Sequence, residues 1–241
     1  MGEQHYRVRV EGDHIRKLAS AKPIQAAAEL IWNAVDADAT RVDLEIDADN
    51  IATRAISVRD NRHGIPRADV EVLFGKLGGS WKAHGNRSKN NGRMLHGKEG
   101  KGRFKALALG RVAEWYIRYF EGSKLLGYSI AIIRDKLEDV RVTEAVEIDG
   151  ALGAGVDVRI TELDRVFRFL DPAHAVQSLS EIFALYLTDY ADVRIFVEHQ
   201  RLDSSQIITS RETFELPSIH DDDKRYKAEV EIIEWRSASE R

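Results

Sequence analysis

Apolar and polar residues alternate with two different periods along this chain, and the first clear pattern is helical. At about 100° per residue, the apolar side chains of residues 23–37 (PIQAAAELIWNAVDA) fill one broad arc. Pro23 suits the first turn of a helix. Glu29, Asn33 and Asp36 fall together on the opposite arc. We therefore predict a helix over 23–37 that packs one face on a core and presents these three polar residues on the other.

Shorter runs alternate with the period of a strand. We predict strands at 41–47, 55–59, 112–120, 124–134, 140–148, 155–163, 193–197 and 226–235. Further helices are predicted at 68–74, from 103 to 109, and at 171–190, where Asp171 is a suitable N-cap and Pro172 a suitable first residue. Strands and helices do not alternate regularly, which disfavours a doubly wound fold. The order predicts an α/β two-layer sandwich, with a mixed, mostly antiparallel sheet and helices on one face.

Composition narrows the function classes. The chain has 241 residues, with 36 Lys and Arg against 40 Asp and Glu, which excludes a uniformly basic nucleic-acid coat. It contains no cysteine, which excludes disulfides, thiolate nucleophiles and cysteine-based metal sites. No apolar run reaches the roughly 18 residues of a membrane helix, and the first 13 residues lack the apolar stretch of a secretion signal. We expect a cytoplasmic protein that has no membrane partner.

One segment departs from this average composition. Nine of the 17 glycines lie between Gly75 and Gly110, and residues 75–105 contain nine Lys or Arg against one acid, Glu99. Long loops of this kind inside a compact chain are usually functional or disordered. A cluster of basic residues is also a footprint of nucleic-acid binding. We favour phosphate binding, which accounts for the same charge.

Three groups of residues have chemistry that suits a nucleotide. A carboxylate and an amide one helical turn apart, Glu29 and Asn33, suit water activation and a magnesium ligand. Asp60 at the end of a predicted strand suits an exocyclic amine, and the following Gly64 allows close approach of a flat ring. The bland alternatives are a solvated helix face and an ordinary Asp-Asn turn. Residues 97–105 (GKEGKGRFK) place glycines before a helix, which exposes backbone N–H groups to a phosphate, although no Gly-Lys-Ser/Thr closes the loop.

These motifs stand in a specific order: ELIWNAVDADATRVDLEI, VRDNRHGI, a basic loop, GKEGKGRFKALALG and GVDVRITEL. In this order they resemble the GHKL ATPase superfamily, which includes DNA gyrase B, ninety-kilodalton heat-shock chaperones, histidine kinases, MutL and the MORC proteins. The resemblance covers about residues 10–200 and is closest to the MutL, MORC and chaperone side. It implies the Bergerat form of the predicted sandwich, with ATP and Mg²⁺ as its ligands.

The resemblance also implies roles for individual residues. Glu29 would be the general base that activates water, Asn33 would ligate magnesium, and Asp36 would shape the phosphate and ribose side of the pocket. Asp60 would bind the adenine amine, and Gly64 and Ile65 would lie by the ring. The β- and γ-phosphates would be held by the loop residues Gly97, Lys98, Gly100, Lys101, Gly102, Arg103 and Phe104, with Lys98 and Lys101 as alternatives for a direct lysine contact.

Two positions depart from the superfamily pattern. Arg62 stands where the second motif usually has its middle glycine, and Val156 stands where the late motif usually has threonine. We expect these changes to alter the turn or weaken adenine binding or selectivity. Neither change affects Glu29 or Asn33, so we expect hydrolysis to be retained.

The resemblance further implies a domain plan and partners. Residues 1–200 would form the ATP-binding domain, with an N-terminal arm at 1–22 and an ATP lid at 75–103, and residues 201–241 would be an extension or the start of a following domain. ATP would close the lid and pair two copies as a homodimer within a larger machine, which acts on DNA or in defence and meets nucleic acid or a partner protein through other domains. The alternatives are a nucleotide-binding regulatory module with little or no hydrolysis, and a phosphotransfer kinase, which the absence of a phosphoacceptor helix disfavours.

Overall fold

The computed structural model describes residues 21–48, 53–74, 87–88, 92–96, 102–163, 171–221 and 224–236. Its helices are α2 (Pro23–Asp36), α3 (Val70–Phe74), α4 (Gly102–Lys105) and α5 (Pro172–Asp189). The strands of its main sheet are β1 (Arg41–Ala48), β2 (Thr53–Asp60), β3 (Gly110–Glu121), β4 (Lys124–Ile133), β5 (Lys136–Val142), β6 (Val146–Glu147), β7 (Gly155–Leu163), β8 (Arg194–Val197) and β9 (Gln200–Arg201).

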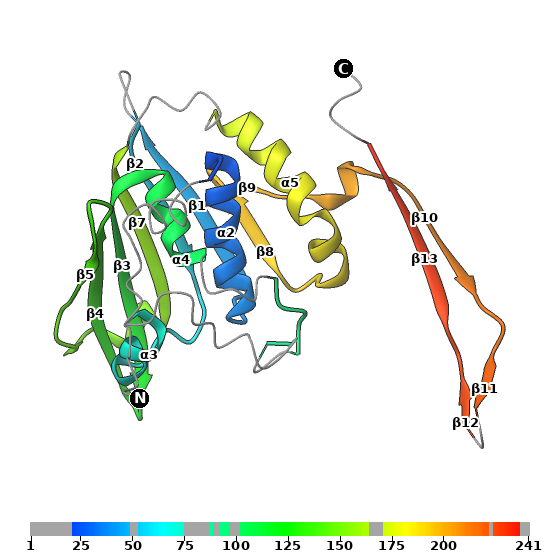
Figure 1. Cartoon of the computed structure of the whole chain (residues 1–241), viewed down its shortest axis with the longest axis horizontal. Helices are drawn as coiled ribbons and strands as arrows, with labels where there is room; N and C mark the ends of the chain where they lie inside the picture. Colours follow the sequence, from blue (N-terminus) through cyan, green and yellow to red (C-terminus); the bar gives the residue numbers. More distant parts are fainter. Residues whose placement is uncertain are drawn as a thin grey trace, which may run out of the picture.

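The main sheet is mixed and mostly antiparallel, as predicted. Its nine strands follow the order β5-β4-β3-β7-β2-β1-β8-β9, and β6 pairs with β4. The parallel pair is β1 with β8, and the other neighbours run antiparallel. Helices α2, α4 and α5 lie together on one face of the sheet (Figure 1). The predicted two-layer α/β sandwich is therefore confirmed.

Helix α2 begins at Pro23, as predicted, and ends at Asp36, one residue earlier than expected. Most of its surface is buried, because it lies on the sheet and also contacts α4 and α5. Alanines let these neighbours approach closely. The prediction that all three polar residues lie on the face away from the core is therefore wrong for Asp36. This residue is only 1% exposed, whereas Glu29 and Asn33 are half-buried.

The strand pattern was predicted well where pairing is regular and poorly where it is interrupted. The expected strand at 140–148 is two strands, β5 and β6, because the register against β4 shifts by one residue between them. Thr143 lies in this break, where its backbone N–H and its hydroxyl both bond the backbone of Ser129. The helix expected at 103–109 is also interrupted: α4 ends at Lys105 and a 3-10 turn over Ala106–Ala108 follows.

Side chains from the helices and the sheet form one core. Along β3, Ala113, Trp115, Ile117 and Tyr119 are buried in it. Tyr116, on the other face of the strand, is 43% exposed. The N-cap prediction for α5 is also confirmed, because the Asp171 carboxylate accepts the backbone N–H of His174.

The C-terminal part projects from the sandwich as a two-stranded arm (Figure 1). The arm consists of β10 (Ile208–Glu215), β11 (Ile219–Asp221), β12 (Lys224–Tyr226) and β13 (Glu229–Trp235). The sequence pattern missed β10 and β11, the second of which ends at Asp221. The single strand expected at 226–235 is wrong, because β12 ends at Tyr226 and β13 begins at Glu229.

Candidate functional site

Between Ala26 and Asp36 of α2, the two residues that are not buried are both polar. Glu29 and Asn33 stand one helical turn apart and are each half-buried. Within the described part of the chain, the Glu29 side chain makes no hydrogen bond or ion pair. A carboxylate of this kind is available to take a proton from a ligand or a water molecule.

Asp60 lies at the carboxyl end of β2 and is buried, with 6% of its surface exposed. Its Oδ1 accepts the backbone N–H of Arg62 at 3.0 Å and that of Val156 at 3.1 Å. The second bond joins the motif VRDNRHGI, which contains Asp60, to the motif GVDVRITEL, which contains Val156. Burial raises the pKa of Asp60, and the positive charges of Arg62 and Arg118 oppose that rise.

Arg62 lies directly beside this carboxylate. Its Nε is 3.1 Å from Oδ2 of Asp60, and its Nη1 donates to the carbonyl oxygen of Asn33 at 3.1 Å. The side chain is only 12% exposed. Its position in the motif predicts an altered turn, but Arg62 is not among the residues with positive φ, so its backbone needs no glycine. The change that Arg62 introduces is therefore in the side chain, which connects the Asp60 turn to α2.

Gly64 is the glycine that this turn requires. Its φ is +76°, and a Cβ at this position would lie 2.0 Å from the carbonyl oxygen of Arg118 in β3. The sequence predicts that Gly64 allows a flat ring to approach closely. In this structure the group that lies close to Gly64 is the backbone of β3. Ile65 follows as a half-buried residue whose carbonyl oxygen accepts the Tyr128 hydroxyl at 2.8 Å. Both contacts fix the turn against the sheet.

We predict that Gly64→Ala lowers the free energy of unfolding by about 2–4 kcal/mol, because a methyl group adds both an unfavourable φ and a clash with backbone. Gly122→Ala is the matched control, since Gly122 also has a positive φ, of +61°, but nothing within 4 Å of its added Cβ. Denaturant titration of both variants measures the difference. Equal losses in the two would show that the contact with β3 is unimportant.

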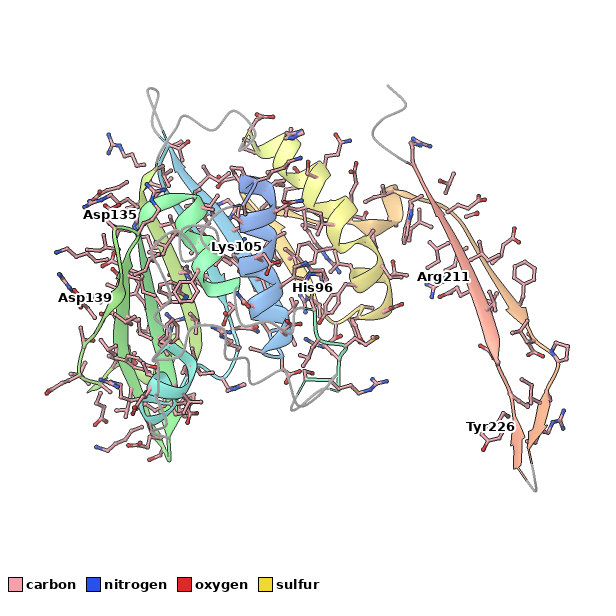
Figure 2. The ribbon with its side chains drawn as sticks, viewed as in Figure 1. His96, Lys105, Asp135, Asp139, Arg211 and Tyr226 are labelled. Atoms are coloured by element: carbon pink, nitrogen blue, oxygen red, sulfur yellow. The ribbon has the colours of Figure 1, made fainter. Side chains whose placement is uncertain are left out.

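Asp36 holds a segment of the predicted lid. Its Oδ1 accepts the backbone N–H of His96 at 2.9 Å. The His96 ring stacks on Trp32, with ring centres 4.1 Å apart and planes within 8°. Figure 2 shows His96 between α2 and α5. In this structure the Asp36 carboxylate therefore positions protein backbone, a role that differs from the ribose and phosphate contacts implied by the resemblance.

The same segment has a second anchor at Arg93. This side chain is buried, donates to the carbonyl oxygen of Ala39 at 2.7 Å and forms an ion pair with Asp192. The backbone N–H of Met94 donates to the Tyr190 hydroxyl at 2.9 Å. In the sequence, Arg93 is one of the nine basic residues between 75 and 105, and no pattern indicates a role for Trp32 or His96. No local pattern distinguishes a buried arginine from an exposed one.

The predicted phosphate loop is only partly visible. Gly97, Lys98, Gly100 and Lys101 lie outside the described residues. Gly102, Arg103 and Phe104 form the start of α4, which packs against α2. The Phe104 side chain is 2% exposed and belongs to the core, where it anchors α4; the contact that the resemblance implies is with backbone amides near Arg103 and Phe104.

A cleft of about 630 Å³ lies next to the Asp60 turn. Its walls come from the turn, from the end of β3 and from the residues before β7, and they are Asn61, Arg62, His63, Pro66, Tyr119, Phe120, Gly153 and Ala154. Glu29, Asn33 and Asp60 do not line it. Arg62 thus lines this cleft, whereas its ion-pair partner Asp60 does not.

Comparisons with known proteins identify the family. The family model of histidine kinase-, DNA gyrase B- and HSP90-like ATPases matches residues 21–147, just over half of the chain. The DNA mismatch repair protein MutL of Shewanella piezotolerans is 40% identical over 55 residues, which are 23% of this chain and 8% of that protein. MutL of Xylella fastidiosa strain M23 is 48% identical over 51 residues, which are 21% of this chain and 8% of that protein.

The match to these relatives is thus confined to a short stretch of each. Among the described residues, no helix is long and apolar enough to cross a membrane. The family match is much broader than the relatives' and runs from the start of α2 through the Asp60 turn to the end of β6. The chain belongs to the family of histidine kinase-, DNA gyrase B- and HSP90-like ATPases.

Proposed function

We propose that this domain binds ATP with magnesium and hydrolyses it, which goes beyond the ATP binding that the family implies. The observation that carries the proposal is the state of α2. From Ala26 to Asp36, where every other residue of the helix is buried, Glu29 and Asn33 remain accessible one turn apart, and the Asn33 backbone is joined through Arg62 to Asp60. A free carboxylate next to an amide oxygen suits water activation beside a metal–phosphate complex.

In the proposed reaction, a water oxygen attacks the γ-phosphorus as the bond from that phosphorus to the bridging oxygen of ADP breaks. The Glu29 carboxylate accepts the proton that the water loses. The Asn33 amide oxygen would hold Mg²⁺, which neutralises phosphate charge when bound. The phosphates would be held by the backbone of residues 97–104, as the resemblance implies.

We further propose that residues 75–103 form a lid with a fixed internal point. The contacts of Arg93 and His96 with the body hold residues 92–96 against α2 and α5. Closure over a nucleotide would then involve the parts of the lid on either side of that point. Lid closure and pairing of two copies through residues 1–22 would be the mechanical result of ATP binding.

We also propose a division of the chain into domains. Residues 1–200 would be the ATP-binding domain, and the arm after residue 200 would be an extension or the start of another domain. Two-stranded sheets are marginally stable alone, and Phe214, Val230 and Ile232 leave 41–49% of their surface exposed on one face of the arm. These features support a packing partner for the arm. The similarity to the DNA mismatch repair protein MutL supports a DNA-acting machine.

The first test is calorimetric titration with a non-hydrolysable ATP analogue, with and without Mg²⁺. We expect magnesium to tighten binding to the wild type about tenfold or more and to have little effect on Asn33→Ala, which lacks the proposed ligand. Gln25→Ala is the matched control, because Gln25 is an exposed amide on the same helix. A wild type that binds no nucleotide under either condition contradicts the proposal.

A second candidate is a nucleotide-binding regulatory module with little or no hydrolysis. Arg62 favours it, because this side chain occupies the carboxylate that the resemblance assigns to adenine. The two candidates differ in turnover. Steady phosphate release that depends on Glu29 supports the ATPase, and binding without release supports the regulatory module.

A further inference from the structure

The inference concerns which base the proposed nucleotide site accepts, and it rests on the proposed function. Both carboxylate oxygens of Asp60 have close neighbours: Oδ1 is hydrogen-bonded, and Oδ2 faces the Arg62 guanidinium in an ion pair that includes no hydrogen bond from Nε. Oδ1 accepts two backbone N–H groups, at 3.0 and 3.1 Å, and Oδ2 lies 3.1 Å from Nε of Arg62. The Asp60 side chain is 5% exposed. A base that approaches this turn from the cleft meets Arg62 before it meets Asp60.

Arg62 has a reason to stay in this position. Besides its ion pair with Asp60, it donates to the Asn33 carbonyl oxygen in the last turn of α2, where the helix dipole also favours a cation. Charge-assisted hydrogen bonds of this kind are stronger than neutral ones. Moving Arg62 aside would break both contacts and leave a buried carboxylate without its cation, which is costly.

A guanidinium at the surface of the site has the opposite hydrogen-bonding character from an exposed carboxylate. An ionised carboxylate only accepts hydrogen bonds and therefore selects a base with a 6-amino group. A guanidinium only donates, through five N–H groups. Two of the three nitrogens of Arg62 face Asp60 and Asn33, and within the described residues no hydrogen bond occupies Nη2. The available group at this position therefore suits a 6-oxo purine at least as well as adenine.

We infer that Arg62 is a specificity-determining residue that masks Asp60, so that the site accepts purine nucleotides with a 6-oxo group, hypoxanthine or guanine, at least as well as adenine nucleotides. Removing the Arg62 side chain unmasks the carboxylate and restores selection for the 6-amino group. A site built to hydrogen-bond a particular polar group of its ligand strongly rejects analogues that lack that group. A site without such a contact discriminates only weakly.

The test is calorimetric titration of the full chain with ADP, IDP and GDP in the presence of Mg²⁺, because diphosphates avoid turnover. For the wild type we expect an affinity for IDP equal to that for ADP within about threefold, or higher. For Arg62→Ala we expect ADP to bind about tenfold or more tightly than IDP. Arg59→Ala is the matched control: it removes an arginine from the exposed ion pair with Asp157 and should keep the wild-type ratio.

Each outcome has a distinct meaning. A wild type that prefers ADP over IDP by about tenfold or more overturns the inference, because such a preference requires an open acceptor at the base. So does an Arg62→Ala variant that folds, by its thermal unfolding curve, and keeps the wild-type ratio. If Arg62→Ala does not fold, the wild-type ratio alone decides. Binding of none of the three nucleotides to either protein rejects the proposed function itself, whereas binding confined to Arg62→Ala rejects only the inferred acceptance of 6-oxo purines.

Discussion

Replacing Glu29 with glutamine is expected to slow ATP turnover by a factor of about 10²–10⁴, the usual contribution of a general base. Glutamine keeps the shape of the side chain and cannot accept the proton that the attacking water loses. Because the Glu29 side chain makes no hydrogen bond or ion pair within the described residues, its replacement breaks no internal contact there. Nucleotide affinity and the thermal unfolding midpoint should therefore stay close to those of the wild type.

Steady-state phosphate release, measured beside calorimetric binding of a non-hydrolysable analogue, separates these effects. Glu71→Gln is the matched control, because Glu71 is an exposed glutamate on α3, remote from the proposed chemistry. Unchanged turnover in Glu29→Gln would remove Glu29 from the mechanism. Lost binding with lost turnover would indicate instead that Glu29 contributes to the pocket rather than to proton transfer.

The second large effect is expected at Trp32. This side chain is 9% exposed and packs against three rings: it stacks on His96, and its centre lies 4.3 Å from that of Phe183 and 5.1 Å from that of Tyr186. Truncation of a buried tryptophan to alanine typically costs about 3–5 kcal/mol. We expect Trp32→Ala to lower the free energy of unfolding by that amount and also to loosen the lid segment that His96 anchors.

Denaturant titration measures the first effect, and amide hydrogen exchange at His96 measures the second, because that N–H is held by Asp36. Trp235→Ala serves as control: Trp235 lies on the arm with 46% of its surface exposed, and its loss should cost less than about 1 kcal/mol. If Trp32→Ala destabilises the protein without faster exchange at His96, the stack supports the core alone and does not anchor the lid.

The chain sequence determined those features that depend on local periodicity and local capping. The helix at Pro23 was predictable because proline suits a first turn and the alanine-rich repeat continues without interruption. The cap of α5 was predictable because Asp171 and Pro172 act within one turn. Asp60 was placed correctly at a strand end because strand alternation stops there. The ordered motifs also sufficed to indicate the ATPase family, since they are contiguous stretches of sequence.

Tertiary structure decided what each polar side chain contacts. Asp36 was expected to face a ligand and Arg93 to be one basic residue of the lid, yet both are buried: Asp36 accepts the backbone N–H of His96, and Arg93 forms an ion pair with Asp192. Arg62 was expected to alter the turn. Its side chain instead contacts the carbonyl oxygen of Asn33, 29 residues away in sequence, and the carboxylate of Asp60, two residues away. Burial and ion pairing arise from elements distant in sequence that pack together, so no local pattern encodes them. The sequence therefore indicated the family, whereas the packing around Asp60 determined that its carboxylate lies against the Arg62 side chain.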